Sequence, residues 1–202
     1  MKIMKTNQLI SVSLIILFIV ALILRLIIPL CGELFLIKNA IVLDDTFIAL
    51  SIARNIFFGN GYSFNGIELT TLITTLWTLV LSVFGFLSKD MLLMFSSALG
   101  GAFFVFSALL FYLILKKIFN RIDVPLIIIT FFLFSPFSIL ISLNALETPF
   151  FIFFLMLIFW FYISFIRKKN FSLVRILILN ILLFILILTR EEGYLVFFSF
   201  IF

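Results

Sequence analysis

Long apolar runs separated by short polar turns dominate the sequence. They lie at about 8–30, 69–87, 91–115, 124–143, 149–166 and 171–189, and a further run begins at Tyr194. A helix needs about 20 apolar residues to cross a bilayer. Hydrophobic residues make up 65% of the chain and charged residues only 11%, whereas a soluble domain carries about a quarter of charged residues. We therefore expect an all-α, polytopic transmembrane helix bundle, whose partner is the lipid bilayer.

The basic residues between the runs predict how the chain crosses. Lys2 and Lys5 precede the first run, and the positive-inside rule places them in the cytoplasm. The same rule asks that the basic clusters at 116–121 and 167–175 also be cytoplasmic. If every run crossed, the first of these clusters would lie outside, so one run between Asp45 and Lys116 is expected not to cross.

The run at 69–87 is the expected exception. It begins with four threonines in six residues, namely Thr70, Thr71, Thr74 and Thr75, which favours an interfacial or re-entrant helix. Five complete crossings then remain, in a multi-pass protein of the cell membrane with a cytoplasmic N-terminus. The last run has nine residues, or about 13.5 Å of helix. We interpret it as a truncated sixth span, and residues 1–202 as a single membrane domain that forms the N-terminal portion of a longer protein.

Composition limits the chemistry. The sequence has no histidine and one cysteine, Cys31, and contains neither a glycine-rich phosphate loop nor a His/Cys metal motif. Proton transfer would have to use Asp, Glu, Lys, Tyr or Cys. The net charge of +5 resides in short clusters that set topology, so no nucleic-acid partner is expected.

Asp44 and Asp45 open the first polar cluster. The segment DDTFIALSIARN, residues 44–55, predicts an amphipathic helix that Gly59 and Gly61 terminate. One aspartate is enough to cap such a helix. A second aspartate adds like-charge repulsion, which makes a carboxylate bind a proton more readily and so suits a general base. We therefore favour a functional role for at least one of them over capping alone.

Two further polar turns are expected on the same outer face as Asp44 and Asp45. Glu147 lies between two strongly apolar runs, and Pro149 suits the first turn of the next helix. A functional Glu147 and an exposed glutamate favoured by the helix dipole are equally good interpretations. Arg190, Glu191 and Glu192 form a charged turn, which is either a solvated loop or a place where the guanidinium binds phosphate.

Two other residues have simple interpretations. Arg25 lies near the outer end of the first run, and snorkelling of its side chain to the headgroups explains it. Trp77 and the many phenylalanines are interpreted as interface anchors and packing residues.

The three polar clusters, taken in order, resemble GT-C type membrane glycosyltransferases. The resemblance is carried by Asp44-Asp45 with the following helix and GNGYSFNG, by Ala145-Leu146-Glu147-Thr148 where a subgroup has Gly-Leu-Glu-Thr, and by Arg190-Glu191-Glu192-Gly193 where it has Arg-Pro-Glu-Gly. Ala145 and Glu191 depart from that pattern. Members of the family are also usually longer, so residues 1–202 would be the N-terminal portion of a transferase module.

The resemblance implies an activity. The enzyme would transfer a sugar from a polyprenyl-phosphate donor to a hydroxyl of a glycan, lipid or protein acceptor at the outer face, with inversion. Asp44 by preference, or Asp45, would be the general base, and Glu147 would orient the acceptor or a cation. Arg190, with Arg54, would neutralise the donor phosphate. The paired carboxylates could hold Mg²⁺ or Mn²⁺, although no metal site is assigned.

A non-catalytic polytopic protein is the alternative. It would be an inactive transferase remnant, a subunit or a transporter component. Transporters place ionisable groups near the middle of the membrane, at broken helices, whereas the acidic residues here lie at the ends of the runs. Transport therefore ranks below catalysis.

Overall fold

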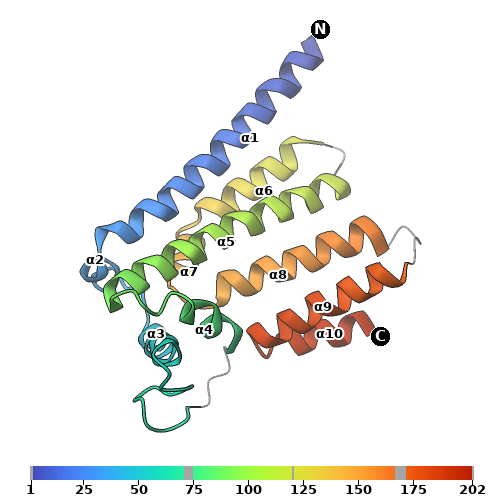
Figure 1. Ribbon diagram of the computed structural model, residues 1–202. Coiled ribbons are helices and arrows are strands. Elements are labelled where there is room, and N and C mark those ends of the chain that lie inside the picture. The colour runs from blue at the N-terminus through green and yellow to red at the C-terminus, as the bar shows by residue number, and fades with distance from the viewer. Residues whose placement is uncertain (1, 71–74, 120, 167–171, 202) are drawn as a thin grey trace.

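The computed structural model describes residues 2–70, 75–119, 121–166 and 172–201, and every regular element in these residues is a helix (Figure 1). The elements are α1 (Lys2–Ile27), η1 (Ile28–Cys31), α2 (Glu33–Lys38), α3 (Asp44–Phe57), α4 (Thr75–Ser82), α5 (Lys89–Ile118), α6 (Asp123–Phe134), α7 (Pro136–Leu143), α8 (Thr148–Phe161), η2 (Tyr162–Ile166), α9 (Leu173–Thr189) and α10 (Gly193–Ile201).

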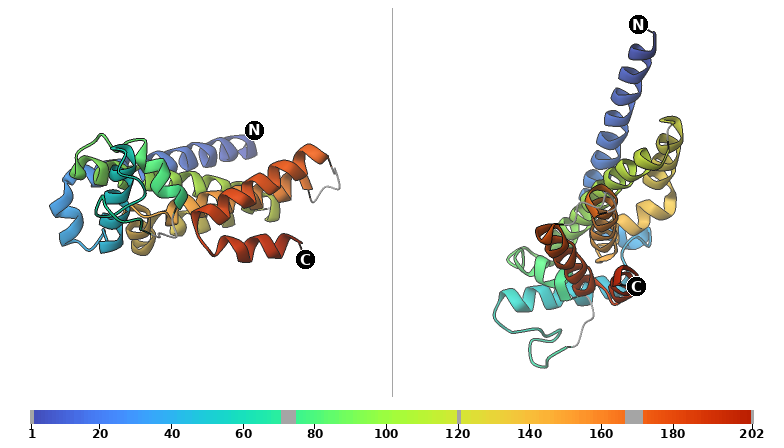
Figure 2. Two further views of the ribbon diagram at one scale, coloured as in Figure 1. Left: turned by 60° about the horizontal axis from the view of Figure 1, so that its bottom comes forward. Right: turned by 90° about the vertical axis from the view of Figure 1, so that its right-hand side faces the viewer.

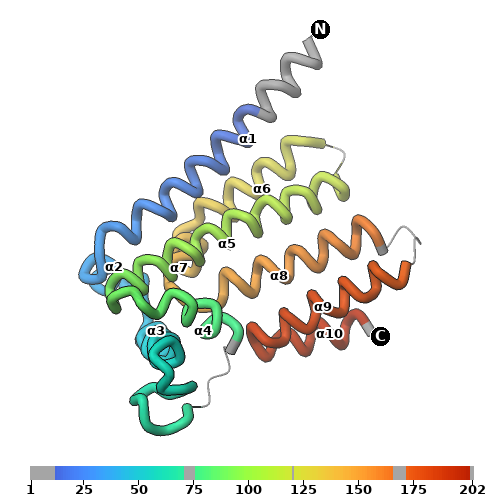
Figure 3. Tube along the Cα trace, viewed as in Figure 1, coloured from blue at the N-terminus to red at the C-terminus, as the bar shows by residue number. Residues whose placement is uncertain are grey.

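The long helices form a bundle around α5, which packs against α1, α6 and α8, while α9 packs against α8 and α10 (Figures 1 and 2). Helix α3 lies across one end of this bundle and is seen end-on in Figure 3, where the long helices are seen from the side. We call this the α3 end. At the opposite end, which we call the basic end, α5 finishes and α6 begins (Figure 1). Lys116, Lys117 and Arg121 belong to this stretch of the chain.

Three segments are long and apolar enough to cross a membrane, namely Val12–Cys31, Lys89–Ile118 and Thr148–Phe165. The number rises to four if the bent pair α6–α7 is one span. Large apolar side chains lie exposed on the outside of the bundle, such as Phe131, which is 73% exposed. This surface suits contact with lipid tails. The apolar helix α9 has 17 residues, so the expectation of five crossings depends on it.

The run at 124–143 is not one straight helix. It consists of α6 and α7, which meet at an angle of 56°. Pro136 has no backbone N–H to continue the α6 ladder, and proline disfavours a helical conformation in the residue before it. Ser135 is accordingly extended and begins α7 as its N-cap, where its hydroxyl accepts a hydrogen bond from the Ser138 N–H at 3.2 Å.

The snorkelling interpretation of Arg25 is wrong. The residue is 1% exposed, and its guanidinium donates to the Ser142 hydroxyl at 2.9 Å and to the Leu133 carbonyl at 2.7 Å. That carbonyl lies next to the break between α6 and α7, where the helical ladder is interrupted. Gly101 gives α1 room, because a Cβ there would lie 2.7 Å from the Arg25 Cβ. Arg25 thus joins α1 to both halves of the bent pair.

The run at 69–87 contains only one short helix among its described residues. Helix α4 has 8 residues, about 12 Å at helical rise, which is too short to cross a bilayer. Thr71 and Thr74 of the expected threonine cluster lie outside the described residues, as do the cytoplasmic-cluster residues Arg167, Lys168 and Lys169. Trp77 is completely buried, so it is a packing residue and not an interface anchor.

Buried apolar side chains form separate clusters along the bundle. The cluster at the α3 end joins α3, α4, α5 and the turn between α7 and α8, and it includes Leu50, Ala53, Trp77, Leu92, Leu143 and Ala145. A second cluster joins α1, α5 and α6, and a third joins α8, α9 and α10. The first cluster supports the polar residues described next.

Candidate functional site

The three polar clusters singled out in the sequence meet at the α3 end of the bundle. They are the first turn of α3, the turn between α7 and α8 at residues 144–147, and the turn between α9 and α10 at residues 190–192. The segments are far apart in sequence, and the links between them are hydrogen bonds, an ion pair and the electrostatic interactions of one buried carboxyl.

Asp44 and Asp45 are the first two residues of α3, and both are exposed. The helix itself is confirmed, and Gly59 and Gly61 beyond its end have positive φ, as expected. The residue in the N-cap position is Leu43, so neither aspartate caps the helix. Two carboxylates in the first turn are nonetheless stabilised by the helix dipole.

A buried hydrogen bond fixes the start of α3 to the second turn. The hydroxyl of Thr46 donates to the Asn144 carbonyl at 2.9 Å. The Asn144 side-chain oxygen accepts from the Leu146 N–H at 3.0 Å, which folds the turn back on itself. Trp77 of α4 donates to the Ala145 carbonyl at 3.1 Å. Asp45, next to Thr46, is thereby held beside the turn that carries Glu147.

Ala145 adopts a left-handed conformation, with φ of 60°. Glycine takes this conformation without steric cost, whereas other L-residues are strained in it by roughly 1–2 kcal/mol. The glycine found at this place in the resembling motif therefore has a physical reason. The strained alanine is completely buried, so the surrounding contacts hold the turn in shape.

Glu147 is 6% exposed, so the exposed-turn interpretation is wrong. Its carboxylate lies 3.5 Å from the Arg190 guanidinium. Burial raises the pKa of the Glu147 carboxyl above its ordinary value; a hydrogen bond from its own N–H and the charge of Arg190 oppose the rise, while the charges of Glu192 and Asp45 add to it. The carboxylates of Asp45 and Glu192 are therefore close enough to act on the Glu147 carboxyl.

Arg190 connects the second and third turns. It donates to both carboxylate oxygens of Glu192, at 3.1 and 3.0 Å, and to the Thr148 hydroxyl at 3.1 Å. Its side chain is 32% exposed, so Arg190 lies partly at the surface. Gly193 makes the tight turn possible, because a Cβ there would lie 2.8 Å from the backbone of Ile187.

Arg54 is not part of this cluster. It lies in the last turn of α3, nine residues after Asp45 and so about 13.5 Å further along the helix axis. Its side chain faces a hollow that Lys89 also lines. The resemblance groups Arg54 with Arg190 as phosphate-binding residues. The structure instead places Arg54 in this hollow with Lys89.

Three polar residues were missed in the sequence, namely Thr46 and Asn144 at this site and Lys89 in the hollow beside Arg54. Thr46 and Asn144 are polar residues in apolar surroundings, and buried polar groups of this kind generally have partners. That signal could have pointed to them. The position of Lys89 depends on where α3 lies against α5, which no local pattern shows.

The described residues do not assemble a cation site. No group of three or more described Asp, Glu, His or Cys side chains is placed to hold a metal ion. The expectation of bound Mg²⁺ or Mn²⁺ therefore has no ligand set to support it in the described part of the chain, and no step below passes through a cation.

Comparison of the chain with protein-family models, with curated proteins and with solved structures found no match. The arguments about function therefore depend on the motifs and on the geometry of the α3 end.

Proposed function

We propose that the protein is a membrane glycosyltransferase that moves a sugar from a polyprenyl-phosphate donor to an acceptor hydroxyl. The observation that carries the proposal is the convergence of Asp45, Glu147 and Arg190 at one end of the bundle. A carboxylate base, a buried carboxyl and a partly exposed arginine are the groups that such a displacement needs.

Asp45 is the proposed base. The sequence ranks Asp44 ahead of it, but Asp45 is the aspartate whose charge acts on Glu147 and which adjoins the Thr46 anchor. Its carboxylate would take the proton from the acceptor hydroxyl as the acceptor oxygen attacks the anomeric carbon. The bond from that carbon to the phosphate oxygen breaks, the electron pair remains on the phosphate, and the anomeric centre inverts.

Glu147 and Arg190 have supporting roles in this reaction. Glu147 is buried beside Arg190, and its carboxyl oxygens could accept a hydrogen bond from the acceptor hydroxyl and so orient it. Arg190 would neutralise the departing phosphate. Because Arg190 is bound to Glu192 through two hydrogen bonds, binding of the phosphate would require Glu192 to give way.

The proposed topology has five crossings, with the α3 end extracytoplasmic and the basic end cytoplasmic. It is supported by the junction between α5 and α6, which carries Lys116, Lys117 and Arg121 and lies at the end opposite α3, in agreement with the positive-inside rule. A Cys31→Ser background is needed for the test, because Cys31 is exposed. In that background, a cysteine at Asn60 should label from outside and one at Arg121 only after the membrane is opened. Labelling of both from the same side contradicts the topology.

Sugar transfer tests the activity. Membranes that contain the chain are supplied with radiolabelled polyprenyl-phosphate sugars, and transfer is compared with that of Asp45→Asn, Glu147→Gln and Arg190→Gln. Loss of a general base is expected to lower the rate by about 10² to 10⁴. Asp123→Asn is the matched control, because Asp123 is an exposed carboxylate at the basic end. Full activity of Asp45→Asn would refute its role as base.

A second candidate is a non-catalytic membrane protein in which the same residues form a polar lock. It is favoured by the saturation of Arg190, which contacts Glu147, Thr148 and Glu192 and so joins the start of α8 to the turn before α10. In that case no donor would be used by the folded chain, and Arg190→Gln would lower the thermal unfolding temperature without changing any activity.

A further inference from the structure

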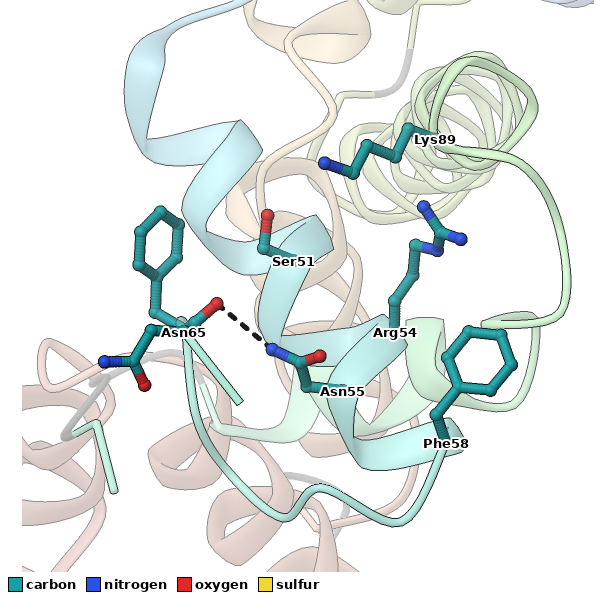
Figure 4. Close-up of a pocket in the computed structure, with 7 residues that line it drawn as sticks. Ser51, Arg54, Asn55, Phe58, Asn65 and Lys89 are labelled. Carbon is teal, nitrogen blue, oxygen red and sulfur yellow. Dashed lines mark hydrogen bonds between the residues drawn. The ribbon is translucent and has the colours of Figure 1, made fainter. Parts of the chain in front are cut away.

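A hollow at the far end of α3 is separate from the cluster around Glu147. It has a volume of about 290 Å³ and is lined by Ser51, Arg54, Asn55, Phe58, Phe64, Asn65 and Lys89 (Figure 4). Three elements contribute: α3, the loop that follows it and the first residue of α5. In the close-up, the side chains of Arg54 and Lys89 extend from α3 and α5 toward the same space.

The charge of this hollow is unbalanced. Its lining contains two cations and no carboxylate. Asp90, the residue after Lys89, is close enough to the Glu33 carboxyl to raise its pKa, and it is not among the lining residues. Two like charges that face one space repel each other, and a bound anion would remove that repulsion.

Arg54 has unused hydrogen-bonding capacity. Its Nε is buried and finds no hydrogen-bond partner in the described part of the chain, and the guanidinium carbon lies 5.8 Å from the centre of the Phe58 ring. A buried donor without an acceptor is costly. An oxygen of a bound anion would satisfy it, and the adjacent Lys89 ammonium and Ser51 hydroxyl could serve the other oxygens of the same group.

The loop over the hollow is held in place independently of any ligand. The Asn55 amide donates to the carbonyls of Ser63 and Phe64 at 2.8 and 3.0 Å, and the bond to Phe64 is the dashed line in Figure 4. The Asn65 side-chain oxygen accepts from the N–H groups of Ile67 and Glu68, both at 2.9 Å. The lining is therefore largely preformed.

The hollow lies where lipid headgroups are expected. Lys89 is the first residue of α5, whose 30 residues extend about 45 Å, close to the thickness of a bilayer with its headgroups, about 40–45 Å. Large apolar side chains surround the hollow in exposed positions, with Phe58 at 58% and Phe64 at 50%. Aromatic residues beside cations are typical of the membrane interface.

We propose that Arg54 and Lys89 bind the phosphate of an anionic membrane phospholipid in this hollow, with the exposed phenylalanines against the lipid's glycerol and upper acyl chains. The site is distinct from the cluster of Asp45, Glu147 and Arg190, and the proposal does not depend on the proposed transferase activity. Arg54 is too far from the cluster around Glu147 to bind the same phosphate as Arg190. The hollow gives Arg54 a ligand of its own.

Lipid binding to the purified protein in detergent tests this proposal. Phosphatidylglycerol is titrated and the bound lipid is counted by native mass spectrometry. The Arg54→Gln/Lys89→Gln variant should bind it about tenfold more weakly, since tenfold corresponds to the loss of about one charge-assisted hydrogen bond. The control Lys117→Gln/Arg121→Gln removes the same charge at the basic end and should bind as the wild type does.

The other outcomes distinguish the sources of phosphate. Equal binding by wild type and the Arg54/Lys89 variant would overturn the proposal, as would an equal loss in the control variant. If inorganic phosphate displaces the lipid at low millimolar concentration, the site takes a soluble phosphate and the lipid assignment is wrong. Should the double variant fail to fold, phosphatidylglycerol binding is measured with the single variant Lys89→Gln. Lys89 is exposed, so its replacement disturbs no packing, and binding equal to that of the wild type would overturn the proposal.

Discussion

The hydroxyl of Thr46 donates a hydrogen bond to the carbonyl of Asn144, 2.9 Å away and 98 residues later in the chain. The bond is buried, and it joins the first turn of α3 to the turn that carries Glu147. Through it, the position of Asp45 relative to Glu147 is set by a residue that has no charge and takes no part in the proposed reaction.

Removal of that hydroxyl is expected to loosen the site. Thr46→Val keeps the side-chain shape and leaves the Asn144 carbonyl without its donor, at a cost of about 1 kcal/mol. For a chain of this size, 1 kcal/mol corresponds to a fall of about 2–4 °C in unfolding temperature. Sugar transfer should fall as well.

The control for this prediction is Thr130→Val. The Thr130 hydroxyl donates to the Leu126 carbonyl within α6, so the same chemical change there breaks no link between elements. Equal behaviour of the two variants in thermal unfolding and in transfer would show that the Thr46–Asn144 bond does not position the site.

Arg25 is expected to be essential for the stability of the bundle. In Arg25→Ala, the Leu133 carbonyl and the Ser142 hydroxyl lose their buried donor and a cavity forms beside Gly101. Hydrogen bonds to charged groups are worth about 1.5–3 kcal/mol each, so we expect a loss of about 3 kcal/mol in the free energy of unfolding. Arg121→Ala, at an exposed site, should cost less than about 0.5 kcal/mol. Unfolding of Arg25→Ala at the wild-type temperature would contradict this role.

The strained turn predicts an unusual response to glycine. Ala49 lies buried in α3 and Ala145 lies buried at a positive φ, so replacement by glycine removes the same methyl group at both positions. Only Ala145→Gly also relieves left-handed strain, worth roughly 1–2 kcal/mol. Ala49→Gly also carries the cost of glycine in a helix interior, about 1 kcal/mol, so Ala145→Gly should be less destabilising by about 2–3 kcal/mol, as measured by denaturant unfolding in detergent. A larger loss at position 145 would mean that the buried methyl, and not the backbone, dominates there.

The stability of the wild type should fall as pH rises because of Glu147. Burial raises the pKa of this carboxyl above its ordinary value of 4.5, so the folded state holds the proton more tightly than the unfolded chain does. The contribution of Glu147 to stability is fully present below pH 4.5 and is lost as pH rises through the folded-state pKa, after which this contribution is constant. Glu147→Gln should remove that decrease from the curve of unfolding temperature against pH. Glu68→Gln, which removes an exposed carboxylate, should retain it.

Much of the helical architecture follows from the pattern of apolar runs. The runs at 149–166 and 171–189 correspond to α8 with η2 and to α9, and the amphipathic segment after Asp44 is α3. Apolar runs of this length have few other ways to satisfy their backbone groups in lipid. The sequence also contains a signal for the break at Ser135, namely a serine followed by a proline. A prediction from run length and hydropathy alone does not use that signal and treats the run as one helix.

The depth of individual polar side chains could not be predicted. Arg25 is interpreted from the sequence as a snorkelling residue, and an exposed turn is one of two equal interpretations of Glu147, since each lies near the end of an apolar run. Their burial results from segments distant in sequence, namely the α6–α7 break around Arg25 and the turn after α9 beside Glu147. The grouping of Arg54 with Lys89 is of the same kind, because it depends on how α3 lies across the start of α5.

The acceptors of Arg25 are synthesised long after Arg25 itself. Leu133 and Ser142 follow it by 108 and 117 residues, so α1 leaves the ribosome and meets the translocon while α6 and α7 do not yet exist. An arginine at the centre of a spanning helix costs about 2.5–3.5 kcal/mol on insertion and one nearer the end costs less, and until the bent pair arrives the Arg25 side chain must reach toward water or headgroups. The guanidinium thus changes surroundings during biogenesis, and the docking of α6–α7 is the step at which the first helix becomes committed to its final place.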